Sequence, residues 1–71
     1  MKTTTNTTVN KYFNNAPVVA IEATEVEGAI KWFGAKQVMQ SPTVWIYEKE
    51  DKGEVTRFVK CKASNQWYKK A

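Results

Sequence analysis

One stretch decides the fold: TVWIYEKEDKGEVTRFVKC, which covers residues 43–61. Residues 43–48 are rich in β-branched and aromatic side chains, which pack well in a strand. Asp51-Lys52-Gly53 fits a hairpin loop with Gly53 in the left-handed backbone region, and residues 54–61 then return antiparallel. The stretch therefore predicts a β-hairpin and, with it, an antiparallel sheet.

Further strands are predicted on both sides of this hairpin. Residues 18–23 form a short run rich in β-branched residues, which favours a strand near the centre of the sheet. A turn at residues 63–65 separates the hairpin from a short final strand over residues 66–69. Residues 9–13 predict a first strand that ends in a turn at Asn14-Asn15.

A helix is predicted between residue 24 and the hairpin. Thr24 and Glu27 match a capping box, in which each side chain bonds the other residue's main-chain N–H. Apolar and long side chains then recur at helical spacing, and we expect Ile30 and Phe33 to lie in the core. The full stripe consists of Val26, Ala29, Ile30, Phe33 and Gln37. Ser41-Pro42 ends the helical region.

The expected fold class is α+β, with the order β-β-α-β-β-β. It is a small, mostly antiparallel sheet of four to five strands with one helix packed on one face. We expect a flexible tail over residues 1–8 and a single domain over residues 9–71, since a 71-residue chain is too short to divide its core.

The inventory of side chains argues against an enzyme. The chain has no His, one Cys and seven acidic residues, so it lacks the parts of most acid–base, nucleophilic and metal sites. We expect no cofactor and no metal. The lone Cys61 rules out an internal disulfide, and no apolar run is long enough for a membrane span, so we expect a cytoplasmic protein.

The positive charge is concentrated at one end of the sequence. Residues 1–53 contain six Lys and six acids, so the net charge of +4 comes from residues 54–71. Five cations lie there against Glu54: Arg57, Lys60, Lys62, Lys69 and Lys70. A polarised basic end attracts anionic partners. The alternative is that these cations only aid solubility and protect an edge strand.

Both faces of the strand over residues 43–48 carry large side chains, Val44 and Ile46 on one and Trp45 and Tyr47 on the other. A three-residue loop places Trp45 and Tyr47 with Arg57, Val59 and Cys61, whereas an even loop places them with Phe58 and Lys60. In either register one face presents aromatic and basic residues to solvent, with Trp67 or Tyr68 on a neighbouring strand. Such a face suits single-stranded nucleic acid, a protein or a second copy of the chain. Alternatively, Trp45 and Tyr47 complete a small core.

The order of elements resembles that of the small phage anti-CRISPR proteins that inhibit type I CRISPR surveillance complexes. The resemblance covers roughly residues 20–68 and rests on Ile21-Glu22-Ala23, a helix with Ala29, Lys31, Lys36 and Gln37, the strand over residues 43–48, and a basic, aromatic C-terminal hairpin. The final hairpin differs in length and turn. The resemblance implies a non-enzymatic inhibitor in the host-cell cytoplasm that occupies a nucleic-acid-binding groove of a protein–RNA complex, and it makes Lys31 and Lys36 contact candidates.

The main hypothesis is therefore a small inhibitor or accessory protein that docks a basic, aromatic surface on a nucleic acid or nucleoprotein complex. The alternatives are a module that binds nucleic acid directly and a homo-oligomeric structural protein, for instance a homodimer. The candidate partner-binding residues are Lys31, Lys36, Trp45, Tyr47, Arg57, Lys60, Lys62, Trp67, Tyr68, Lys69 and Lys70.

Overall fold

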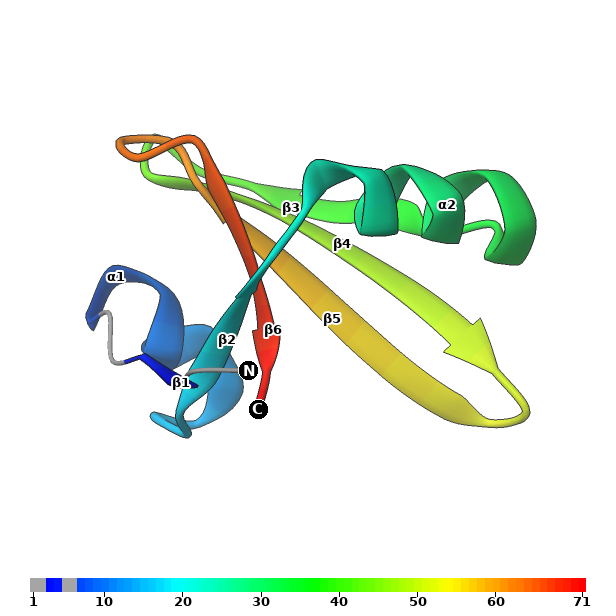
Figure 1. Cartoon of the computed structure of the whole chain (residues 1–71), viewed down its shortest axis with the longest axis horizontal. Coiled ribbons are helices and arrows are strands. Elements are labelled where there is room, and N and C mark those ends of the chain that lie inside the picture. Colours follow the sequence, from blue (N-terminus) through cyan, green and yellow to red (C-terminus); the bar gives the residue numbers. More distant parts are fainter. Residues whose placement is uncertain (1–2, 5–6) are drawn as a thin grey trace.

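A computed structural model describes residues 3–4 and 7–71 and shows an antiparallel sheet with one main helix (Figure 1). Its elements are β1 (Thr3–Thr4), α1 (Thr7–Asn10), the 3-10 helix η1 (Lys11–Phe13), β2 (Val18–Ile21), α2 (Ala23–Phe33), β3 (Lys36–Gln40), β4 (Val44–Asp51), β5 (Glu54–Cys61) and β6 (Gln66–Lys70). The strand order is β1-β2-β6-β5-β4-β3, with the two-residue β1 added to five main strands. The α+β prediction is confirmed.

The β4–β5 hairpin has a two-residue turn at Lys52-Gly53, whose φ angles of 52° and 83° are both positive. Positive φ at both positions defines the turn whose twist matches that of paired strands. Gly53 is left-handed as predicted, but the loop is one residue shorter than expected. Tyr47 therefore stands opposite Phe58, and Trp45 opposite Lys60. Of the two registers left open by the sequence, the structure has the one expected for a loop with an even number of residues.

One face of the sheet, which we call the helix face, packs against α2. Val26 and Ala29 of α2 are buried there against a cluster that includes Phe58. The cluster contains Val19, Ile21, Val26, Ala29, Ala35 and Phe58, with Tyr47 and Trp67 packed against it. The core on this face is small because α2 covers only part of it.

The predicted helix was too long. Helix α2 ends at Phe33 because Gly34 takes φ 67°, and its N-terminal cap position is Glu22, not Thr24. Gln37 lies in strand β3. Ile30 and Phe33 are 42% and 49% exposed, so the prediction that they lie in the core is wrong. Both belong to the last turns of a helix that ends earlier than its apolar spacing suggests.

The predicted strand over residues 9–13 is also wrong, because these residues form the end of α1 and then η1. Val9 and Phe13 are four residues apart and both are buried, which is a helical spacing. They cover the second face of the sheet, over Val44, Ile46 and Val59. This second face is therefore partly covered, and is not left entirely to solvent.

Residues 1, 2, 5 and 6 of the predicted flexible tail lie outside the described residues. Of the rest of that tail, Thr3 and Thr4 stand opposite Val19 and Val18 of β2, and Thr7 begins α1.

Candidate anion-binding surface

Four of the predicted contact residues meet on the helix face beside α2. Strand pairing puts Trp45, Lys60 and Trp67 in one row across β4, β5 and β6. Lys62 lies in the turn directly after β5, and its ammonium group reaches the same Trp45 ring as Lys60. We call Trp45, Lys60, Lys62 and Trp67 the tryptophan–lysine surface. All four side chains are half-buried.

The two indole rings hold the two ammonium groups. Lys60 Nζ lies 4.9 Å from the centroid of the Trp45 ring and 5.9 Å from that of Trp67. Lys62 Nζ lies 5.3 Å from the Trp45 centroid, and the main-chain N–H of Lys62 donates to Thr43 O at 3.0 Å. The Tyr47 ring meets Trp67 edge-on, with centroids 5.6 Å apart. Contacts of this kind restrict the lysines, so both charges are held beside the Trp45 ring.

The surface has donors and positive charge, and among the described residues no counter-ion contacts it. The ion pairs in this part of the chain join Arg57 to Glu48 and Lys69 to Glu25, and neither includes Lys60 or Lys62. The Trp45 Nε1–H is buried and donates to no acceptor in the described structure. A buried donor without an acceptor costs about 1–3 kcal/mol. The two ammonium groups therefore suit an anion, whereas the buried Nε1–H lies out of reach of a ligand on the surface.

Gln40 extends the row and was missed by the sequence analysis. It stands opposite Trp45 at the outer strand β3, and its Oε1 accepts a hydrogen bond from Gln37 Nε2 at 3.2 Å. This residue was overlooked because residues 36–40 were assigned to the helix. The end of α2 at Gly34 was the signal that could have placed it.

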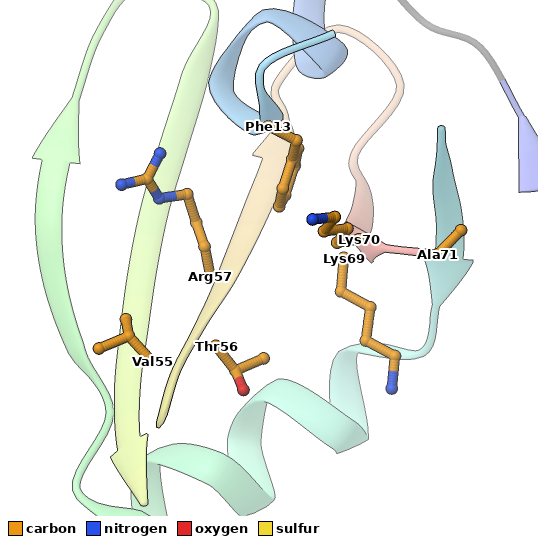
Figure 2. Close-up of a pocket in the computed structure, with 7 residues that line it drawn as sticks. All are labelled: Phe13, Val55, Thr56, Arg57, Lys69, Lys70 and Ala71. Atoms are coloured by element: carbon orange, nitrogen blue, oxygen red, sulfur yellow. The ribbon is translucent and has the colours of Figure 1, made fainter. Parts of the chain in front are cut away.

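Other predicted cations lie on the second face. Figure 2 shows Arg57, Lys70 and Phe13 around a hollow of about 320 Å³, while Lys69 points toward α2. Arg57 is engaged: its Nε and Nη2 each lie 2.7 Å from Glu48 Oε2, and its Nη1 donates to Tyr12 O at 2.7 Å. Tyr68 packs against the core of this face. These residues are therefore separated from the tryptophan–lysine surface.

The remaining predicted residues are engaged elsewhere. Lys69 Nζ pairs with Glu25 Oε2 at 2.7 Å and so joins β6 to α2. Lys31 Nζ lies 5.0 Å from the centroid of the exposed Trp32. Lys36 lies on the outer strand β3 opposite Glu48. None of these three contributes to the row of Trp45, Lys60 and Trp67.

Cys61 is buried in the core of the second face. A hydrogen bond from the Ser64 side chain, aided by main-chain hydrogen bonds, lowers the pKa of its thiol. Among the residues described, no three Cys, Asp or Glu side chains form a group that could hold a metal ion. No helix in the described ranges is long and apolar enough to cross a membrane.

Comparisons with known proteins return no match: no family model, no curated protein and no solved structure is similar to this chain. The resemblance to phage anti-CRISPR proteins stays a prediction.

Proposed function

We propose that this chain is a non-catalytic binding module whose tryptophan–lysine surface binds the phosphate backbone of a nucleic acid, free or held in a nucleoprotein complex. The observation that carries the proposal is the pair of ammonium groups on one indole ring, to neither of which a carboxylate of residues 3–4 or 7–71 is paired. When the two lysines neutralise phosphates, cations condensed along the nucleic acid are released, which favours a polyanion over a single charge.

The geometry favours contact with phosphates over stacking with bases. Lys60 lies against both indole rings and Lys62 against one, so the lysines compete with a base for the ring faces. The rings then act mainly by positioning the ammonium groups. Binding through the backbone carries little sequence information, so we expect weak sequence preference.

The test is binding of fluorescent single-stranded and double-stranded oligonucleotides, measured by anisotropy at several salt concentrations. The double variant Lys60→Met/Lys62→Met removes two charges and keeps most of the side-chain packing. For single strands each lost phosphate contact reduces the salt slope of log K by about 0.7, so the variant should lose about 1.4. Its melting temperature should change little.

Lys11→Met/Lys52→Met is the matched control, because it removes the same charge from η1 and from the hairpin turn. If both double variants lose the same affinity, only the net charge matters and the surface is not the site. If the unchanged protein binds no oligonucleotide at low salt, the proposal fails for free nucleic acid. The same binding measurement on a nucleoprotein complex then tests the other case, in which the nucleic acid is held by a protein.

The inhibitor role implied by the anti-CRISPR resemblance is a narrower form of this proposal. It requires the same surface to occupy a nucleic-acid groove of a type I surveillance complex. Such an inhibitor would reduce target-DNA binding by the purified complex, and Lys60→Met/Lys62→Met would relieve the inhibition.

A further inference from the structure

One end of the molecule exposes large apolar side chains. In the described part of the chain, six large hydrophobic residues are at least 39% exposed: Ile30, Trp32, Phe33, Val38, Met39 and Val55. Three of them are in the last turns of α2 and two are in β3, which follows α2 directly. Phe33, Val38 and Val55 line the same hollow of about 330 Å³. Grouped exposure of this kind marks an interaction surface.

The same end contains an open strand edge. In the described part of the sheet, strand β3 is last in the order and pairs with β4 alone (Figure 1). All five of its residues are exposed. Edges that stay solvated are usually protected by charges or bulges. Here Lys36 and an irregularity between Gln37 and Met39 interrupt the edge, yet Val38 and Met39 leave it apolar.

Charges of both signs are present at this end. The hollow beside β3 is lined by Lys36 and Lys49 and by Glu48 and Glu50, of which Glu48 also pairs with Arg57. The chain as a whole has a net charge of +4, which repels a second copy on approach. We call β3 and the hollow beside it, which Phe33, Val38 and Val55 line, the β3 end. Because charges of both signs lie there, a cation of one copy can face an anion of another. A second copy therefore fits here better than a polyanion does.

We infer that a second copy of this chain docks at the β3 end, about a two-fold axis that places the two β3 strands antiparallel, so that the end of α2 in each copy lies near the far end of β3 in the other. The same patch is used by both copies, so the assembly closes as a dimer. An axis perpendicular to the sheet keeps both helix faces on one side. The dimer would then present its two tryptophan–lysine surfaces in the same direction.

The test is sedimentation of the protein alone over a wide range of concentrations. We expect the mass to rise from that of a monomer to about twice that value and to stop there, as closed symmetry requires. Val38→Lys should keep the protein monomeric. Ala20→Lys is the matched control, since it adds the same charge at an exposed strand residue near the other edge of the sheet, and it should dimerise like the unchanged protein.

Salt separates this inference from the proposed function. Added salt screens both the repulsion between two positive chains and the attraction between opposite charges at the β3 end, so dimerisation should change little, whereas phosphate binding weakens steeply. A monomer at every concentration overturns the inference. So does a mass that grows without limit, or equal behaviour of Val38→Lys and Ala20→Lys.

Discussion

The tryptophan–lysine surface and the β3 end both lie at the surface of the molecule, but different side chains lack partners there: charged ones on the first and apolar ones at the second. On the former, indole rings contact ammonium groups within the same chain, and no described acidic residue pairs with these ammonium groups. At the latter, charges of both signs are present, and the apolar side chains are left exposed. The contrast shows that net charge and apolar exposure are concentrated in different regions, which meet at β3, where Gln40 stands opposite Trp45.

The largest expected effect is the difference in lost stability between truncating a buried and an exposed phenylalanine. Phe58 is 1% exposed under the helix face, whereas Phe33 is 49% exposed at the β3 end. Phe58→Ala should cost about 3–5 kcal/mol of the free energy of unfolding. Phe33→Ala should cost about 1 kcal/mol or less, since it removes mainly a contact with Lys49 Nζ, 4.3 Å from the ring centroid. Thermal melts of both variants measure the difference.

Phe58→Ala removes a large share of the stability of so small a domain and can leave it unfolded. Phe58→Leu is the milder variant that should stay folded, and we expect it to lose about 1.5 kcal/mol or less of the free energy of unfolding. If Phe33→Ala destabilises the protein as much as Phe58→Ala does, the end of α2 belongs to the core. The apolar end would then not be a free surface.

A smaller effect concerns the Trp45 indole. Trp45→Ala removes a ring and should cost about 3 kcal/mol. Trp45→Phe keeps an aromatic ring and also removes the buried Nε1–H that has no acceptor in the described structure, so stability should change by less than about 1 kcal/mol. Since Nε1 is buried, a bound phosphate should not reach it, and Trp45→Phe should keep the affinity of the unchanged protein for oligonucleotides. A marked loss of affinity with an unchanged melting temperature would show that the ring turns on binding and that the Nε1–H takes part.

Local turn chemistry made the hairpin predictable. Lys52-Gly53 accepts positive φ at two successive positions, and the strands on either side are β-branched and aromatic. Residues 9–13 misled the prediction, because Val9, Lys11 and Phe13 alternate as in a strand while Val9 and Phe13 are also one helical turn apart. Packing against β4 and β5 decides between the two patterns, and that packing is not visible in sequence.

The candidate surface depends on which strands pair with each other and in which register. Trp45, Lys60 and Trp67 come from three strands, so their meeting requires both the register of the hairpin and the placement of β6 beside β5. Either register was open on sequence grounds. Residue types alone therefore identified the contact candidates, and the strand pairing selected Trp45, Lys60, Lys62 and Trp67 from them.

The smallest expected effect concerns the glycines that set the length of α2, and so the position of β3. Gly34 ends the helix with φ 67°, and its N–H donates to Ala29 O, so Gly34→Ala strains the backbone and should cost about 1 kcal/mol. Gly28 lies within the helix, where an added Cβ would be 3.9 Å from Trp32 Cδ1, an ordinary contact. Gly28→Ala should therefore stabilise the protein by about 0.4–1 kcal/mol, because it restricts the unfolded chain. Opposite shifts in melting temperature would confirm that α2 stops at Phe33. If Gly34→Ala also stabilises the protein, the helix continues past Gly34, β3 does not begin where the structure places it, and the β3 end loses the open edge on which the proposed dimer depends.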